Sequence, residues 1–381
     1  MIKILTVIGA RPQIIKAAAI SRAVKNSFSD KIEERILHTG QHYDANMSQV
    51  FFDELDIPAP HYNLGVGSGS HGEQTAKMID GIEKVLRSEH FDGIILYGDT
   101  NSTLAGAVAA AKMQVPVFHI EAGLRSFNMT MPEEQNRIVC DHLSSILFAP
   151  TQTAVNNLAN EGLTSSKALF RGNKGRLVIN SGDVMYDNAL YFSKLAEQKS
   201  TILKDCCLTP NNYILATIHR DFNTDDPQRI GSIFNALSTI ADKNDIPVIL
   251  PLHPRTRRCL PDSISERIQI IPPASFFDIL VLEKNAKVVM TDSGGVQKEA
   301  FFFRKPTIIL RPETEWVEIL DNHAGILVDA DYNRIVSAYM NLADRTIVFP
   351  PLFGEGDASS IILQRIYDYL SMDGLQFFNQ L

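Results

Sequence analysis

At 381 residues the chain exceeds what one ordinary hydrophobic core supports, so two domains of near-equal size are expected. Lys and Arg total 36 against 44 Asp and Glu, and the formal charge of −8 argues against a sequence-independent nucleic-acid surface. The four cysteines have neither CxxC nor metal-site spacing, which is typical of a reduced cytoplasmic protein rather than of a disulfide framework.

The first half of the chain alternates short apolar runs with longer helical patterns. The runs are KILTVI, EERILHTG, DGIILYGDT and VPVFHIEAG, and no basic-then-apolar leader precedes the first of them. Such alternation is typical of βαβ units on a parallel sheet that is covered on both faces. Residues 1–182 are therefore predicted to form a doubly wound, Rossmann-like domain. No segment reaches the length of a membrane span, so no membrane association is expected.

The same scheme restarts at Tyr213 with YILATIH, PVILPLH, IQIIPP, KVVMTD, PTIILRP and GILVD. These runs predict a second Rossmann-like domain over residues 183–356. The polar stretch RGNKGRLVINSGD is suited to a hinge, although part of it could be the last strand of the first domain, and the boundary is placed near Gly182. Residues 357–381 are predicted to form a helix that packs back on the first domain. The predicted fold class is α/β with two doubly wound parallel sheets.

Three carboxylates follow apolar runs in the first half: Asp99 in LYGDTNST, Glu121 in FHIEAGLRS and Glu133 in MPEEQNR. Ligands of an open parallel sheet bind beyond the carboxyl ends of its strands, where such side chains can reach them. Each acid alone is more often a cap or a complement to a helix dipole. Together they can converge and raise one another's pKa, which would keep one of them protonated near neutral pH. This placement predicts an enzyme.

Two loops are suited to phosphate. In GARPQIIK, Arg11 and Lys16 flank the start of a helix, although an ordinary strand-to-helix turn with surface bases has the same pattern. In TDSGGVQKEA, Ser293–Gly295 open a helix whose exposed N–H groups can hold a diphosphate. Glu299 follows one turn later, where it could accept hydrogen bonds from a ribose diol or simply face solvent.

Histidines end three strand-like runs, at His119, His219 and His253. A lone histidine in such a position is more often a hydrogen-bonded structural residue than a catalyst. His219 is followed directly by Arg220, so this pair is predicted to face a phosphate.

The order of these motifs resembles that of one enzyme family. GARPQIIK, TGQHYD, GDTNST, HIEAGLRS with PEEQNR, HR, LHP, DSGGVQKEA and RPETEW occur as in the bacterial and archaeal non-hydrolysing UDP-N-acetylglucosamine 2-epimerases, over nearly the whole chain. The resemblance implies a glycosyltransferase-B architecture with a UDP-sugar in the interdomain cleft. It also implies a homodimer that needs no nicotinamide or other cofactor and no metal.

The resemblance further implies a reaction and residue roles. UDP is eliminated across C1–C2 to give 2-acetamidoglucal and adds back as C2 is protonated on the other face, which converts UDP-N-acetylglucosamine to UDP-N-acetylmannosamine. Asp99, Glu121 and Glu133 match the catalytic carboxylates, and His219 matches a histidine near the diphosphate. The residues expected to bind UDP and sugar are Arg11, Lys16, Arg137, His253, Phe276, Ser293, Gly294, Gly295, Glu299 and Arg311. Within that set, Phe276 matches an apolar residue near uracil and Glu299 the ribose contact.

Departures from the commonest family pattern leave the substrate open. GARPQ, QHYD and HRDFN stand where many members have GTRPE, QHRxM and HRREN, which predicts a changed or lost allosteric UDP-N-acetylglucosamine site. GARPQIIKAA, RSFNMTMPEE and SGGVQKEAFFFRKP resemble a subgroup that includes epimerases of UDP-2,3-diacetamido-2,3-dideoxyglucuronic acid, used in O-antigen sugars. The motifs are also compatible with a hydrolysing UDP-N-acetylglucosamine 2-epimerase, and the fold with a glycosyltransferase or a non-catalytic UDP-sugar binding protein.

Overall fold

The computed structural model describes residues 1–41, 57–171, 174–252, 260–261, 263–342 and 345–371. The chain divides into two compact units. The first comprises Met1–Asn188 and the C-terminal segment from Leu352, and the second comprises Ala189–Pro351. The first dividing point lies within helix α7 (Val184–Lys199), a few residues beyond the predicted Gly182. Among the described residues, no helix is both long and apolar enough to cross a membrane.

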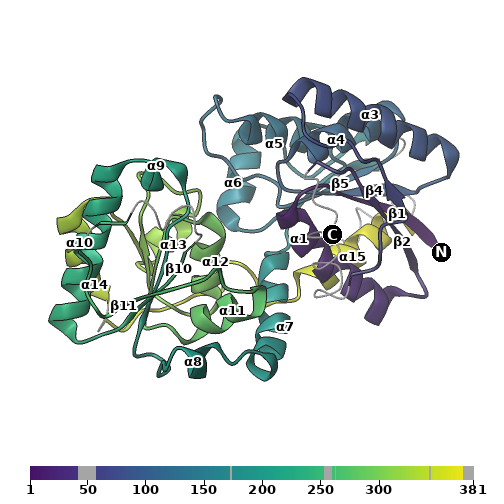
Figure 1. The fold of residues 1–381 in the computed structure, drawn as a ribbon. Coiled ribbons are helices and arrows are strands. Elements are labelled where there is room, and N and C mark those ends of the chain that lie inside the picture. Colours follow the sequence, from purple (N-terminus) through teal and green to yellow (C-terminus); the bar gives the residue numbers. More distant parts are fainter. Residues whose placement is uncertain (42–56, 172–173, 253–259, 262, 343–344, 372–381) are drawn as a thin grey trace. The chain divides into compact units, whose positions relative to one another are not determined.

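The first unit is built on a single sheet with the strand order β3-β2-β1-β4-β5-β6-β8-β7 (Figure 1). Neighbouring strands are parallel except for β7 and β8, which are antiparallel. The strands are β1 (Ile2–Ile8), β2 (Ile32–His38), β3 (Tyr62–Asn63), β4 (Gly93–Tyr97), β5 (Val117–Ile120), β6 (Ile146–Ala149), β7 (Ser166–Arg171) and β8 (Lys174–Asn180). The described helices are α1 (Arg11–Ala23) with a π-helical turn at Val24–Phe28, α3 (His71–Ser88), α4 (Asn101–Lys112), α5 (Pro132–Leu143), α6 (Gln152–Asn160) and α15 (Ala358–Ser371).

Helices bury the first sheet on both faces, which explains why its strands are continuously apolar. The helices α3 and α4 pack on one face, in a core that includes Leu5 and Leu96. On the other face, Tyr369 of α15 packs edge-on against Phe118 of β5, with ring centroids 5.9 Å apart. The same helix contacts α1, and Asp187 accepts hydrogen bonds from its first backbone N–H groups. The C-terminal helix thus completes the core of the first unit.

The second unit has one parallel sheet with the order β11-β10-β9-β12-β13-β14. Its strands are β9 (Ile214–Thr217), β10 (Val248–Pro251), β11 (Ile268–Ile271), β12 (Val288–Thr291), β13 (Thr307–Ile309) and β14 (Gly325–Leu327). The described helices are α8 (Ile202–Asp205), α9 (Asp221–Thr224), α10 (Pro227–Asn244), α11 (Phe276–Asn285), α12 (Gly294–Phe302), α13 (Val317–Asp321) and α14 (Tyr332–Leu342). Residues of α10 and α14 pack on one face of the sheet, and residues of α11 and α12 pack on the other (Figure 1).

Each sheet has a point at which the strand order reverses, and doubly wound folds bind their ligands at such points. The reversal lies between β1 and β4 in the first unit and between β9 and β12 in the second. Loops beyond the carboxyl ends of these strands form the crevice where doubly wound sheets bind ligands. Arg11 and Asp99 follow the first pair of strands, and His219 and Ser293 follow the second. The predicted fold class is confirmed.

Candidate active site

Asp99 lies in the turn after β4, where two residues of α5 hold it. Its carboxylate forms an ion pair with Arg137, and Asn136 Nδ2 donates a hydrogen bond to its carbonyl oxygen at 2.9 Å. Burial disfavours the charge of Arg137, but its ion pairs with Asp99 and Glu134 outweigh this and raise its pKa. About 30% of the Asp99 side chain remains exposed. The carboxylate is therefore both oriented and reachable.

Glu121 follows β5 in the left-handed backbone region, with φ of 71°, a conformation uncommon for a non-glycine residue. Its carboxylate forms an ion pair with Lys16 of α1. Gly98 packs closely against this ion pair: a Cβ at Gly98 would lie 3.1 Å from Glu121 Oε2 and 3.4 Å from Lys16 Nζ. Asp99 and Glu121 thus flank one turn, and Lys16, expected among the phosphate contacts, is held by a carboxylate.

The two neighbouring glutamates of α5 differ sharply in their surroundings. Glu133 is exposed in the first turn, and no described residue forms a hydrogen bond or ion pair with its side chain. Glu134 is 1% exposed and accepts hydrogen bonds at 3.0 Å from the backbone N–H groups of Ser126 and Phe127. It also pairs with Arg137. Sequence reasoning missed Glu134, although its i,i+3 spacing to Arg137 is a usable signal.

Gln13, rather than the predicted basic residues Arg11 and Lys16, holds the backbone of the loop after β1. Gln13 Oε1 accepts hydrogen bonds from the N–H groups of Gly9, at 2.8 Å, and Ala10, at 3.1 Å. Its Nε2 donates to the carbonyl oxygen of Tyr97 at 2.9 Å, which ties this loop to the turn that carries Asp99. Arg11 is exposed at the first position of α1. The Gln13 side chain was not singled out in the sequence, because its link to Tyr97 depends on another strand.

Asp292 organises the equivalent edge of the second unit. This buried carboxylate, between β12 and α12, accepts hydrogen bonds from the N–H groups of His219 and Arg220, each at 3.0 Å, and from Asn223 Nδ2 at 3.1 Å. The His219 side chain is left exposed at the loop. The DSGG motif therefore fixes the His219–Arg220 loop through its aspartate, a role that the sequence did not reveal.

The start of α12 is open enough for a ligand to approach its backbone. Ser293 is the N-cap, and its Oγ accepts a hydrogen bond from Val296 N at 3.5 Å. A Cβ at Gly294 would come no nearer than 3.5 Å, to Arg311 Nη1, and at Gly295 no nearer than 3.9 Å, to Ser293 Oγ. Glu315 holds the Arg311 guanidinium with two hydrogen bonds, at 3.0 and 3.1 Å. The free N–H groups and positive end of this helix favour an anion.

The remaining predicted contacts of the second unit lie on α11 and α12. The Phe276 ring packs edge-on against Phe192, with centroids 5.3 Å apart. Glu299 lies close enough to Glu283, whose side chain is fully buried, for the two carboxyl groups to influence each other's charge. Burial and the negative charge of Glu299 raise the pKa of Glu283 well above its ordinary value. His253 lies outside the described residues.

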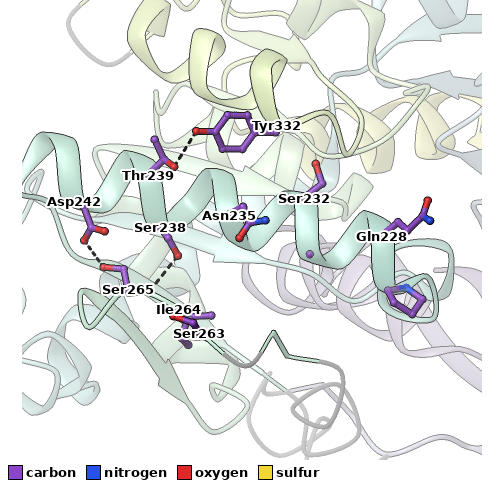
Figure 2. Close-up of a pocket in the computed structure, with 12 residues that line it drawn as sticks. Gln228, Ser232, Asn235, Ser238, Thr239, Asp242, Ser263, Ile264, Ser265 and Tyr332 are labelled. Carbon is purple, nitrogen blue, oxygen red and sulfur yellow. Dashed lines mark hydrogen bonds between the residues drawn. The ribbon is translucent and has the colours of Figure 1, made fainter.

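A separate groove of about 970 Å³ runs along α10 in the second unit (Figure 2). It is lined by small polar side chains, including Ser232, Asn235 and Thr239, and Thr239 shares a hydrogen bond with Tyr332 at 3.0 Å. Asp242 is the charged residue of the lining, and it accepts a hydrogen bond from Ser265. Among the described residues that line the groove there is no cation for a diphosphate and none of the predicted site residues.

Each unit thus has a chemical feature of its own. The first unit holds carboxylates beside cations, which is suited to acid–base work, and the second holds a helix start suited to an anion. Among the described residues, no three His, Cys, Asp or Glu side chains gather as they would around a metal ion.

Comparison with known proteins decides the family. The sequence model of the family described as UDP-N-acetylglucosamine 2-epimerase matches residues 25–367. The chain belongs to this family. The resemblance drawn from the sequence motifs is confirmed, and with it the expectation of an enzyme of the epimerase class.

Relatives of this epimerase match it over almost their whole lengths. The UDP-2,3-diacetamido-2,3-dideoxy-D-glucuronate 2-epimerase of Pseudomonas aeruginosa is 47% identical, with 97% of this chain and 99% of that protein covered. The UDP-N-acetylglucosamine 2-epimerase of Methanocaldococcus jannaschii is 39% identical, with 96% and 99% covered. The crystal structure of the Methanocaldococcus jannaschii UDP-GlcNAc 2-epimerase in complex with UDP-GlcNAc and UDP has a TM-score of 0.79 at 38% identity, with 96% and 99% covered.

Proposed function

We propose that this protein inverts C2 of a UDP-linked 2-acetamido sugar without net hydrolysis. Membership of the epimerase family is the observation that carries the proposal, and the turn flanked by Asp99 and Glu121 supports it from geometry. The proposed reaction proceeds by elimination of UDP to 2-acetamidoglucal and re-addition of UDP. No nicotinamide or metal is required by this chemistry.

The chemistry explains why carboxylates are needed. The hydrogen on C2 is not acidic beside an acetamido carbon, so departure of the diphosphate from C1 must assist its removal. A base takes the C2 proton, the C1–O bond breaks, and the electron pair of that bond leaves with UDP. In the second half, UDP attacks C1 while an acid delivers a proton to the opposite face of C2. We assign the proton transfers to Asp99, Glu121 and Glu133 as a set.

The second unit would hold the nucleotide. The open helix start at Ser293, Gly294 and Gly295 supports a diphosphate site, with Arg311 close to Gly294. Glu299 would accept hydrogen bonds from the ribose. In this proposal Phe276 packs near the uracil.

Charges near the reacting bonds would assist UDP departure. Arg11 is exposed at the β1–β4 reversal, and His219 is exposed at the β9–β12 reversal. We place both near the diphosphate, where a cation stabilises the charge that develops on the leaving group. Lys16 and Arg137 would act through the carboxylates that they pair with. A homodimer and a cytoplasmic setting complete the proposal and follow from the family resemblance and the cysteine pattern.

Two substrates are candidates, and the level of identity to relatives orders them. The relative at 47% identity is a UDP-2,3-diacetamido-2,3-dideoxy-D-glucuronate 2-epimerase, whereas the UDP-N-acetylglucosamine 2-epimerase of Methanocaldococcus jannaschii is at 39%. We therefore propose the diacetamido-glucuronate nucleotide first and UDP-N-acetylglucosamine second.

Proton NMR in D2O tests the proposal. The purified protein is incubated with each nucleotide sugar in turn, without acceptor or added nicotinamide. We expect deuterium at C2 of the starting sugar and formation of its C2 epimer, with little free UDP. Accumulating UDP and free amino sugar would identify a hydrolysing enzyme instead. No change with either sugar would contradict the proposal and favour a glycosyltransferase or a binding protein.

A further inference from the structure

His119 of β5 is completely buried and bonded at both ring nitrogens. Its Nδ1 lies 2.7 Å from Asp141 Oδ1, and its Nε2 lies 2.8 Å from the carbonyl oxygen of Gly98. The sequence suggested only a structural histidine at this position. The two contacts link α5 to the turn that carries Asp99.

Both partners of the ring can only accept hydrogen bonds. A backbone carbonyl has no proton to donate. Asp141 is held as a carboxylate, because its second oxygen, Oδ2, pairs with Arg125 Nη1 at 2.8 Å and accepts a hydrogen bond from Gly123 N at 3.2 Å. Two acceptors on opposite sides of one imidazole require a proton on each ring nitrogen.

Surrounding groups support the charged ring. Burial alone would lower the pKa of His119, but interactions with Cys140 and Asp141 outweigh it and raise the pKa well above the ordinary value. Both of these residues come from α5, and Arg125 balances the charge of Asp141 from the other side. Two acceptors, one of which is the Asp141 carboxylate, thus lie on opposite sides of a buried cation.

We propose that His119 is an imidazolium across the neutral pH range and acts as a positioning residue that holds the catalytic turn of Asp99 through the carbonyl of Gly98. Gly98 has φ of +59°, and its N–H donates to Ile120 O at 3.0 Å, so the ring completes a clamp on both polar groups of this residue. Asp99 is the next residue in the chain. A shift of the Gly98 carbonyl would rotate the Asp99 backbone and displace its carboxylate.

The same helix secures the turn from two directions. Asp141 of α5 holds the ring beneath Gly98, while Arg137, one turn earlier in α5, pairs with the Asp99 carboxylate itself. Glu121, two residues after His119, lies against Gly98 on its other side. A single buried cation thus fixes the backbone on which two of the proposed catalytic carboxylates depend. The expected effect on turnover rests on the proposed function, but the protonation state does not.

Nitrogen-15 NMR of the full-length protein, labelled at histidine, tests the protonation state directly. We expect one imidazole ring with a proton on both nitrogens, protected from exchange with solvent and still present at a pH well above the ordinary histidine pKa of about 6.5. Substituting Asp141→Asn should abolish this signal, since the ring then loses its counter-charge. A spectrum in which every histidine is neutral at that pH would overturn the proposal.

Kinetics of Asp141→Asn test the positioning role. We expect kcat to fall about 10- to 100-fold with KM little changed, as for a small misplacement of catalytic groups. The remaining rate should also fall as pH rises through the pKa of His119, which burial lowers once the Asp141 charge is gone, whereas the wild type shows no such step. Glu161→Gln is the matched control, because Glu161 also pairs with Arg125 but lies at the surface.

The outcomes separate the two claims. An Asp141→Asn protein that folds and retains the wild-type kcat and pH profile would overturn the positioning role. If the wild type turns over no UDP-sugar, the proposed function fails, while the NMR result still decides whether His119 is charged.

Discussion

Glu134→Gln is the substitution that best separates stability from catalysis in this protein. The wild-type carboxylate is buried, accepts three hydrogen bonds from Ser126 and Phe127, and pairs with Arg137. The amide keeps the volume and one acceptor oxygen but turns an NH2 group toward N–H donors. Removing one partner of a buried charged pair costs about 3–5 kcal/mol. Since the amide oxygen retains part of the bonding, we expect a loss of about 3 kcal/mol.

Differential scanning calorimetry provides the assay. For a unit of this size, a loss of about 3 kcal/mol corresponds to a decrease in Tm of roughly 6–12 °C. Glu133→Gln is the matched control at the adjacent position, because its side chain is exposed and forms no hydrogen bond or ion pair with a described residue. We expect its Tm to change by about 1 °C or less. Its kcat should nevertheless fall about 100-fold or more, as expected for loss of an acid–base group.

The pH dependence gives a second check on Glu134. Burial raises the pKa of Glu134, but hydrogen bonds from Ser126 and the ion pair with Arg137 outweigh burial and hold the pKa below its ordinary value. Its stabilising effect is therefore present above the unfolded pKa of about 4.3 and is lost as pH falls through the lower folded pKa. The difference in Tm between wild type and Glu134→Gln should shrink in acid. Equal Tm values at pH 7 would refute this reasoning.

Three other substitutions test the geometry at separate points. Gly98→Ala places a Cβ 3.1 Å from Glu121 Oε2 in a left-handed residue, so we expect a loss of about 1–2 kcal/mol in calorimetry together with reduced turnover. Glu283→Gln removes a buried acid whose pKa is raised by burial and by the charge of Glu299. Such a group lowers the stability of the wild type as pH rises from the unfolded pKa of about 4.3 toward the raised folded pKa. The variant should therefore be more thermostable than wild type at pH 8, and the difference should shrink toward pH 5. Asp292→Ala leaves the N–H donors of the His219 loop without their acceptor, so the loop should lose its position and UDP affinity measured by titration calorimetry should fall about tenfold or more. Unchanged affinity would contradict that role.

The sequence was sufficient for the features that depend on local pattern. Alternating apolar runs and helical segments predicted two parallel sheets, and the strand ends predicted that Asp99, Glu121 and Glu133 would converge. Asp99 and Glu121 follow neighbouring strands, β4 and β5, which is the ordinary result of a short βαβ connection, and the convergence of all three stays a prediction. The start of α12 was recognisable because serine and two glycines signal a helix N-terminus by themselves.

Partners set by tertiary packing could not be predicted in the same way. Gln13, which follows β1, bonds to Tyr97 at the end of the neighbouring strand β4. Asp292, which follows β12, bonds to His219 beyond the neighbouring strand β9. These contacts depend on side-chain direction at the ends of neighbouring strands, which no local spacing encodes. The ion pair of Lys16 with Glu121 could not be predicted for the same reason, since only the fold brings Glu121 to α1; its contact with the phosphates stays a prediction. The protonated state of His119 likewise required knowledge of both of its acceptors.

Positional isotope exchange tests the proposed elimination of UDP most directly. The nucleotide sugar that the protein turns over is prepared with oxygen-18 in the bridge between C1 and the β-phosphate. If UDP leaves and re-adds, the label scrambles into the non-bridging β-phosphate oxygens, and it does so in the recovered starting sugar as well as in the epimer. UDP held too tightly to rotate would also retain the label, so the epimer is formed in D2O at the same time. An epimer with the label wholly retained in the bridge and no deuterium at C2 would contradict the proposed mechanism.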